Sequence, residues 1–293
     1  MAEEHTPKLI VVGAAGQVGS AIVRLVPDAV AVTRADVDLA DPGALSSLSS
    51  FFSTPPAGPA PILINAAAFT AVDAAEDADK TDTVWAVNAE APARLAALGI
   101  PIIHISTDYV FNGELPVGRE NAVDAPTDPI NAYGRSKLAG EQAVLEQGGH
   151  VVRTSWVYSG PAHPSRDFVG TMLRLAENGV DPGVVDDQYG RPSEAGMVAS
   201  AIVNLAQHIA QGKDVPRILH AAGAGPVITW YEFARRIFAL GGHDPDRVRP
   251  IPTSEYPTPA PRPANSALDI SEWERAGLQP LPAWQGSLER ALR

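Results

Sequence analysis

The chain has 293 residues, a net charge of −12 at neutral pH and no cysteine. Disulfides, thiolate chemistry and cysteine-bound metals are therefore excluded, and the acidic balance argues against a protein that grips nucleic acid regardless of its sequence. The start, MAEEHTPK, is polar and acidic, and no apolar run reaches the roughly 20 residues of a membrane span. We therefore expect a cytoplasmic protein with neither a nucleic-acid nor a membrane partner.

Apolar segments with the character of strands alternate with segments of helical spacing through the first half of the chain. The expected strands are 8–13, 29–33, 61–67, 101–106 and 150–155, and the expected helices between them are 17–25, 78–98 and 132–147. Strands that are apolar throughout and alternate with helices indicate a parallel sheet covered on both faces. The predicted fold class is therefore α/β, a Rossmann-like doubly wound sheet with a smaller C-terminal α/β domain.

The pattern is looser after residue 155. Helices are expected over 166–177, 195–210 and 230–240, with a short strand over 217–223 and a proline-rich tract over 249–266. Such tracts often form linkers, but Trp273 and Trp284 lie beyond this one, so we expect an ordered extended segment. The predicted domains are 1–158, to which 195–222 return, and a smaller one made of 159–194 and 223–293.

A glycine-rich turn follows the first expected strand. Gly13, Gly16 and Gly19 give the spacing G-x-x-G-x-x-G where the first helix begins. Small residues at this turn let the backbone approach a pyrophosphate closely, and the helix N-terminus stabilises its charge. Because the motif lies between a strand and a helix, it predicts a dinucleotide site rather than a chance turn.

The second strand ends in AVTRADVDLAD, at the position that selects between dinucleotides. A carboxylate there favours NAD through the adenosine ribose, whereas an arginine favours the extra phosphate of NADP. Arg34 follows the strand directly, and Asp38 and Leu39 are expected near the adenine. We predict NADPH, with NADH as the alternative, since a solvated charged loop explains Arg34 nearly as well.

Tyr133 and Lys137 lie four residues apart in NAYGRSKLAGE and so share one face of an expected helix. A lysine beside a tyrosine favours the phenolate and makes the phenol a usable proton donor near neutral pH. Thr107 ends the fourth strand, at the edge where doubly wound sheets bind ligands. These three residues resemble the catalytic Ser/Thr-Tyr-Lys set of the short-chain dehydrogenase/reductases. The alternative is an exposed helix with an ordinary tyrosine and lysine.

Seven segments in order along the chain resemble the dTDP-4-dehydrorhamnose reductase family of the extended short-chain dehydrogenase/reductases. They are INAAAFTAVDAAE, AVNAEAPARLA, HISTDYVFNG, PINAYGRSKLAGE, RTSWVY, DQYGRPS and RPANSALD. The resemblance implies NADPH-dependent reduction of the C4 ketone of dTDP-4-dehydro-β-L-rhamnose. Tyr133 would donate the proton, Thr107 would hold the oxygen, and Lys137 would tune Tyr133 and anchor the ribose. The larger domain would bind NADP and the smaller one the nucleotide-sugar.

The resemblance also implies the remaining binding residues. Cofactor contacts are expected from Gly13, Gly16, Gln17, Val18, Gly19, Arg34, Asp38, Leu39, Ala66, Ala67, Ala68, Tyr133 and Lys137. Substrate contacts are expected from Val72, Asp73, Thr107, Asp108, Tyr109, Asn131, Tyr133, Trp156, Arg191, Arg262 and Ser266. Arg191 and Arg262 are the candidate diphosphate ligands, because guanidinium groups match phosphate oxygens. His104, inside an apolar strand, is expected to be structural.

Some members of the family form a magnesium-bridged dimer through acidic side chains at the start of the first helix. Ser20 and Ala21 stand there in this chain. Neither side chain supplies a carboxylate, so we expect no metal, no magnesium bridge, and a monomer or a weak homodimer.

Three alternative functions are compatible with the same fold. Tyr109 stands where related 4,6-dehydratases have a glutamate, which argues against elimination chemistry. A reductase or epimerase of another dTDP-4-ketosugar would use the same hydroxyl groups. A non-catalytic regulatory subunit, resembling that of methionine adenosyltransferase, is the alternative outside the enzymes.

Overall fold

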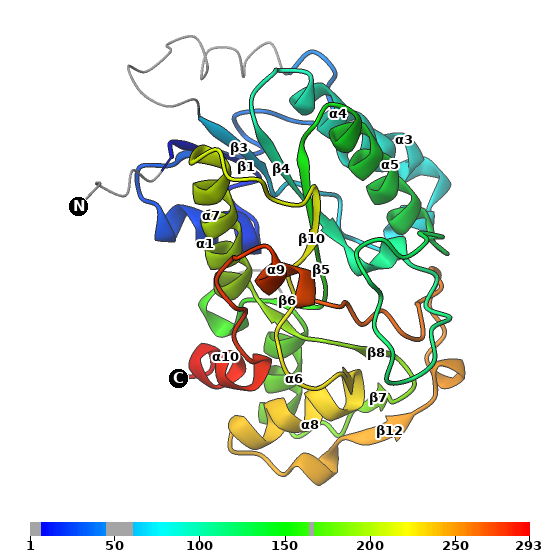
Figure 1. Cartoon of the computed structure of the whole chain (residues 1–293). Helices are drawn as coiled ribbons and strands as arrows, with labels where there is room; N and C mark the ends of the chain where they lie inside the picture. Colours follow the sequence, from blue (N-terminus) through cyan, green and yellow to red (C-terminus); the bar gives the residue numbers. More distant parts are fainter. Residues whose placement is uncertain (1–6, 45–60, 164–166) are drawn as a thin grey trace, which may run out of the picture.

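A six-stranded parallel sheet forms the centre of the computed structural model, which describes residues 7–44, 61–163 and 167–293. The strand order is β10-β5-β4-β3-β1-β2 (Figure 1). The strands are β1 (Leu9–Val12), β2 (Val30–Val32), β3 (Ile62–Asn65), β4 (Ile102–Thr107), β5 (His150–Thr154) and β10 (Ile218–His220). The predicted fold class is confirmed, and each strand expected from the sequence is present with slightly different ends.

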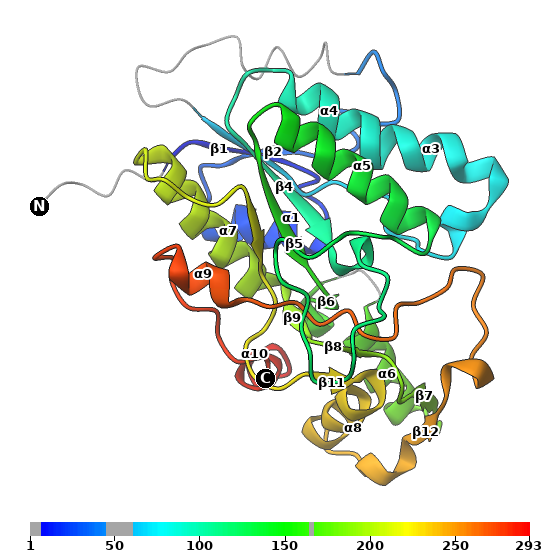
Figure 2. The same cartoon turned by 45° about the vertical axis from the view of Figure 1, so that its right-hand side comes forward.

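Helices cover both faces of this sheet (Figure 2). Helices α1 (Gln17–Leu25) and α7 (Ala195–Ala210) pack on the face that Leu9 and Val11 share. Helices α4 (Ala91–Ala96) and α5 (Ala132–Glu146) cover the face of Ile10 and Val12. Because successive strand residues point to opposite faces, burial on both faces explains why these strands are apolar throughout.

The helix expected over 78–98 is interrupted. It consists of a short 3-10 turn, α3 (Thr81–Trp85), a π-helical turn (Ala86–Glu90) and α4. Within the π-helical turn, buried Asn88 accepts a hydrogen bond from the Phe69 N–H at 2.8 Å and donates to the Phe69 carbonyl at 3.1 Å and to the Ser136 hydroxyl at 3.0 Å. The interruption therefore ties the loop after β3 to α5, a contact that local sequence periodicity does not reveal.

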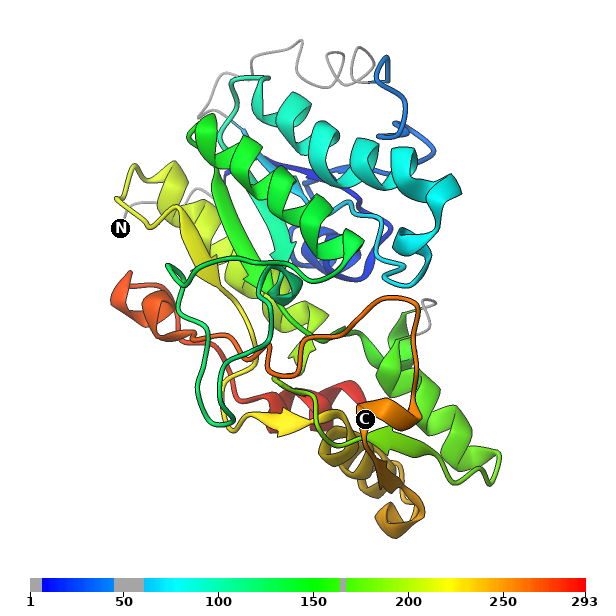
Figure 3. The same ribbon diagram turned by 90° about the vertical axis from the view of Figure 1, so that its right-hand side faces the viewer.

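A second group of elements lies beyond the carboxyl edge of the sheet (Figure 3). Its helices are α6 (Phe168–Glu177), α8 (Trp230–Leu240) and α10 (Trp284–Ala291). Three strand pairs accompany them: β6 (Val157–Tyr158) with β9 (Ser193–Glu194), β7 (Gly183–Val185) with β12 (Arg249–Ile251), and β8 (Tyr189–Gly190) with β11 (Ile228–Thr229). An apolar core of its own, centred on Phe233, Phe238 and Trp284, holds this group together.

The proline-rich tract is ordered and largely extended, as expected. Asn265 holds it in place by donating to the carbonyls of Leu115, Pro116 and Arg119. It leads to α9 (Ser271–Arg275), whose Trp273 is buried in the core beneath the six-stranded sheet. The late part of the chain thus contributes to both groups of elements, and the expected domain boundaries stay a prediction.

Two expectations fall partly outside the described residues, namely the polar N-terminal segment at 1–6 and the start of a helix at Arg166. In the part of the chain that the structure describes, no helix combines the length and apolar character that crossing a membrane requires.

Candidate active site

Two cavities follow the carboxyl edge of the sheet and share part of their walls. One, of about 280 Å³, lies between the ends of β1 and β2, and the other, of about 430 Å³, lies at the ends of β4 and β5. Both are lined by Ala15, Gly16, Ala66 and Ala68. The shared walls make the two cavities one trough, at the edge where ligands bind in doubly wound sheets.

The glycine turn explains how the chain forms this trough. Gly13 has a φ of +84°, and a Cβ atom there would lie 2.5 Å from the Ala67 nitrogen. A Cβ atom on Gly19 would lie 2.2 Å from the Gly13 oxygen. Gly13 and Gly19 therefore allow close packing, whereas Gly16 lines both cavities. No side chain of the described residues caps the N-terminus of α1, so its backbone N–H groups remain free for an anion.

The smaller cavity ends at the residues expected to contact adenosine. Arg34, Asp38 and Leu39 all line it, together with Thr33 and Val37, which the sequence reasoning missed. The Arg34 side chain is 81% exposed and pairs with Asp38 at 3.1 Å. Exposed ion pairs contribute little stability. The Arg34 guanidinium can therefore leave Asp38 and turn towards a phosphate bound in the smaller cavity.

Thr107 and Tyr133 meet at the other end of the trough. The Thr107 hydroxyl accepts a hydrogen bond from the Tyr109 N–H at 3.2 Å and donates to Asp108 at 3.1 Å, and Tyr133 lines the same cavity as Thr107. Lys137 lines the same cavity. The structure therefore brings together the three residues that the sequence proposed for the chemistry.

The charge state of Tyr133 differs from the expectation. Burial raises the pKa of Tyr133 to about 12, although the Thr107 hydrogen bond acts in the opposite direction. The Lys137 nitrogen is turned towards other groups: it donates to the Ile105 carbonyl at 2.7 Å and lies 3.1 Å from the Nε2 atom of His104. The expected shift towards phenolate was wrong in direction. A neutral phenol is nevertheless the form that a proton donor needs.

Unpaired oxygen atoms gather at this end of the trough. Among the described residues, the Ser106 hydroxyl, the Oδ2 atom of Asp108 and the Thr154 hydroxyl are buried without a hydrogen-bond partner, and all three residues line the larger cavity. Thr154 is the register partner of Thr107 in the neighbouring strand. Burial raises the pKa of Asp108 to about 7, opposed by its bonds to Ser266 and Thr107. Since buried polar groups are normally paired, these oxygens indicate a polar ligand.

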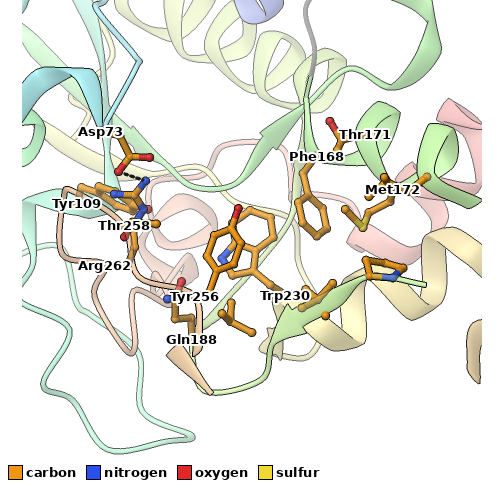
Figure 4. A pocket seen from close by; sticks show the side chains of 15 residues that line it. Asp73, Tyr109, Phe168, Thr171, Met172, Gln188, Trp230, Tyr256, Thr258 and Arg262 are labelled. Atoms are coloured by element: carbon orange, nitrogen blue, oxygen red, sulfur yellow. Dashed lines mark hydrogen bonds and ion pairs between the residues drawn. The ribbon is translucent and has the colours of Figure 1, made fainter. Parts of the chain in front are cut away.

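A third cavity, of about 550 Å³, lies between the sheet and the second group of elements (Figure 4). Asp73, Tyr109 and Arg262 line it as expected, and Arg262 donates to Asp73 at 2.9 Å. Its other side carries residues that the sequence reasoning missed: Phe168, Gln188, Trp230, Tyr256 and Thr258. These come from separate elements, so no local motif could have revealed them.

Two aromatic contacts connect this third cavity to the trough. Tyr109 meets Tyr133 edge to face, with ring centroids 5.8 Å apart. Trp156, which lines the trough, stacks on Trp230 with centroids 3.7 Å apart. The two pairs of rings therefore form the boundary between the third cavity and the reaction site.

Several predicted substrate residues lie away from the three cavities. Arg191 is buried, and its guanidinium donates to Glu120 at 2.6 Å and to the carbonyls of Leu268 and Gly225 at 2.8 and 3.1 Å. These donors are engaged within the protein, and the assignment of Arg191 as a diphosphate ligand stays a prediction. Asn131 caps α5 and donates to the Pro261 carbonyl, and its expected contact with the substrate also stays a prediction. Neither Val72 nor Ser266 lines these cavities.

The chain is similar to known proteins over nearly its whole length. A family model described as the RmlD substrate binding domain matches residues 7–293. The dTDP-4-dehydrorhamnose reductase of Mycobacterium tuberculosis is 41% identical, covering 98% of this chain and 93% of that protein. The dTDP-4-keto-6-deoxy-D-glucose reductase of Streptomyces niveus is 38% identical, covering 98% of this chain and 96% of that protein. The structure of the dTDP-4-dehydrorhamnose reductase from Bacillus anthracis, in complex with NADP, is 30% identical in sequence and superposes with a TM-score of 0.84. The match covers 97% of this chain and 98% of that one.

Proposed function

This chain belongs to the RmlD substrate binding domain family, and on that premise we propose that it is an NADPH-dependent reductase of a dTDP-4-ketosugar. Membership confirms the resemblance carried by the seven segments. The substrate is dTDP-4-dehydro-β-L-rhamnose and the product dTDP-L-rhamnose, as the names of the relatives over nearly the full chain support. The observation that carries the proposal is that Thr107, Tyr133 and Lys137 line one cavity at the end of a glycine-lined trough.

The trough fits a dinucleotide. The N–H groups at the start of α1, beside Gly16, would hold the anionic oxygens of the pyrophosphate, and Arg34 would supply the cation for the 2′-phosphate. Lys137 holds the ribose at the other end. When bound, the reduced nicotinamide supplies a hydride to the ketone carbon.

The side chains of this chain supply the proton and the orientation. Tyr133, neutral through burial, donates its phenolic proton to the ketone oxygen as that oxygen gains charge. Thr107 holds the same oxygen by a hydrogen bond and so fixes the ketone within reach of Tyr133. The sum of hydride and proton converts the ketone to an alcohol.

The third cavity suits the nucleotide part of the substrate. Its aromatic residues Phe168, Trp230 and Tyr256 offer flat apolar faces to a base. Arg262 is the guanidinium that lines it, which makes Arg262 the diphosphate ligand in place of Arg191. We place the sugar between this cavity and Thr107, beside Trp156 and Tyr109.

A second ketosugar is a real alternative within the same chemistry. The Streptomyces niveus relative is named for another dTDP-4-ketosugar and is nearly as similar to this chain as the Mycobacterium tuberculosis one. A cytoplasmic location and a monomer or weak homodimer without a magnesium bridge remain part of the proposal, the latter because Ser20 and Ala21 carry no carboxylate.

The deciding experiment supplies the purified protein with dTDP-4-dehydrorhamnose or dTDP-4-keto-6-deoxy-D-glucose, each with NADPH or NADH. Loss of nicotinamide absorbance gives the rate, and NMR identifies the product and its C4 configuration. We expect NADPH consumption with dTDP-4-dehydrorhamnose and formation of dTDP-L-rhamnose. No consumption with either sugar and either cofactor would favour the non-catalytic regulatory subunit.

A further inference from the structure

His104 lies fully buried behind the reaction site and contacts Lys137. In β4, Ile102 belongs to the core beneath α5 and Ile103 to the opposite core. Alternation along the strand therefore turns His104 towards α5, where its Nε2 atom lies 3.1 Å from the Lys137 nitrogen. On the other side, its Nδ1 atom lies 3.0 Å from the amide nitrogen of Asn65, its register partner in β3.

The direction of the hydrogen bonds in this cluster follows from a backbone group. The Ala67 N–H can only donate, and it bonds to the Asn65 side-chain oxygen at 3.2 Å. That bond turns the Asn65 NH₂ group towards His104, so Nδ1 of the ring must accept. A neutral imidazole then carries its proton on Nε2, the atom that faces Lys137.

This tautomer creates a conflict for a charged lysine. An ammonium group has three donors and no acceptor, so it would direct a donor at the Nε2–H group of His104. An uncharged amine has a lone pair that accepts from Nε2–H, and it still donates to the Ile105 carbonyl at 2.7 Å. With Asn65 and His104 arranged in this way, every hydrogen bond in the cluster has a donor and an acceptor only when Lys137 is an amine.

We propose that Asn65 and His104 are positioning residues that act through Lys137, holding its nitrogen in place and shifting it from ammonium towards amine. This inference rests on the proposed function, since it concerns the lysine that holds the cofactor ribose. Ribose hydroxyls and cofactor phosphates favour the ammonium, so binding of NADPH near pH 8 draws a proton from solvent onto Lys137 in those molecules where it is an amine. The Ala67 contact links this cluster to the wall of the trough.

The charged neighbours of Lys137 agree with this assignment. Burial lowers the pKa of Lys137 to about 8, while Glu141 on the same helix acts in the opposite direction. Glu141 is itself neutralised by a buried ion pair with Arg153 of β5 at 2.8 Å. Tyr133 from α5 and Asp108 after β4 line the same cavity. Burial raises the pKa of both, so Tyr133 stays neutral at pH 8, whereas Asp108 is half ionised near pH 7. Burial also keeps His104 neutral by lowering its pKa.

The tautomer can be tested without turnover. Nitrogen-15 NMR of the ligand-free protein distinguishes Nε2–H from Nδ1–H histidines, and His104→Phe identifies the signal among the seven histidines. We expect His104 to be the Nε2–H tautomer from pH 6 to pH 8, within the range where its ring is neutral. An Nδ1–H tautomer or an imidazolium would overturn the proposal.

Asn65→Asp tests the coupling to the cofactor. A carboxylate accepts from Nδ1–H, so the ring tautomer reverses, Nε2 accepts from the lysine, and the ammonium is favoured. Calorimetry of NADPH binding in two buffers of different ionisation enthalpy at pH 8 should show proton uptake in the parent protein and less in the variant. NADPH binding should weaken as the pH rises, and the midpoint pH of this loss should be higher in the variant by roughly one pH unit. Asn204→Asp is the matched control, because Asn204 is a partly buried residue of α7 whose side-chain oxygen also accepts a backbone hydrogen bond, from the Gln279 N–H.

If Asn65→Asp does not fold, His104→Phe is the second variant, because it keeps the ring and removes both nitrogens. The His104→Phe variant should no longer take up a proton when NADPH binds. His150→Phe, at the far end of β5, should still take one up. Equal uptake in parent and variant would contradict the proposal. These binding readouts stand even if no ketosugar is reduced, so failure of the proposed function and failure of this inference are distinguishable.

Discussion

The indole ring of Trp156 lies flat on that of Trp230, with centroids 3.7 Å apart and an interplanar angle of 11°. Trp156 has a φ of +48°, which is strained for a large side chain. Gly190 makes room on its other side, since a Cβ atom there would lie 2.5 Å from the Trp156 ring. The wall between the reaction site and the third cavity therefore depends on three residues from separate elements.

Gly190→Ala should displace Trp156 and weaken binding of the nucleotide-sugar. We expect the KM for the sugar to rise about tenfold, as the loss of a well-placed aromatic contact of roughly 1.4 kcal/mol implies. Steady-state kinetics measure this, with the KM for NADPH as an internal reference. Gly286→Ala, inside helix α10 and without close contacts, is the control and should leave both constants unchanged. An unchanged sugar KM in Gly190→Ala would remove Trp156 from the binding wall.

Tyr133→Phe should abolish most turnover and leave NADPH binding intact. The phenylalanine keeps the ring beside Tyr109 and removes only the proton donor, so kcat should fall by about 10²- to 10⁴-fold. Stopped-flow hydride transfer and NADPH fluorescence titration separate the two effects. Tyr158→Phe is the matched control, because the Tyr158 hydroxyl is buried without a partner among the described residues. Near-normal turnover of Tyr133→Phe would assign the proton to another group.

Arg262→Ala and Arg191→Ala should have different consequences. Arg262 lines the third cavity, so its loss should raise the KM for the nucleotide-sugar by about tenfold to a hundredfold, the value of a charged hydrogen bond. Arg191 is enclosed by Glu120 and two carbonyls. Its loss leaves these groups unpaired and should cost roughly 2–3 kcal/mol of stability. Kinetics and thermal unfolding of both variants test this contrast, and a large sugar KM effect confined to Arg191→Ala would restore the sequence assignment.

Asp108 should make folding stability depend on pH in an unusual direction. Burial raises its pKa from 3.8 to about 7, so the folded protein binds a proton that the unfolded chain has released. The stabilising contribution of the neutral carboxyl is complete below about pH 4 and is lost as the pH rises through 7.

Asp108→Asn removes this titration. The Tm of the variant relative to the parent should therefore rise between about pH 4 and 7 and stay level above that range. Circular dichroism melts across this range measure it, and Asp246→Asn, at an exposed position, is the control. A constant difference for Asp108→Asn would mean that this carboxyl is ionised in the folded protein.

The parallel sheet could be predicted from the sequence because its causes are local. Apolar runs bounded by glycines and helices specify strands buried on both faces, and Gly13, Gly16 and Gly19 mark the turn that a dinucleotide needs. Thr107, Tyr133 and Lys137 could be named in advance, since a strand end and a helical spacing of four residues place them.

Tertiary structure alone decided the environment of these groups. Whether Arg262 or Arg191 faces a cavity depends on which carbonyls and carboxylates surround each one, and these come from segments far apart in the chain. The aromatic wall of Trp156 and Trp230 and the contact of His104 with Lys137 arise in the same way. The pKa of Tyr133 is set by burial, which depends on how the whole chain packs and is not encoded by the spacing of two residues on one helix.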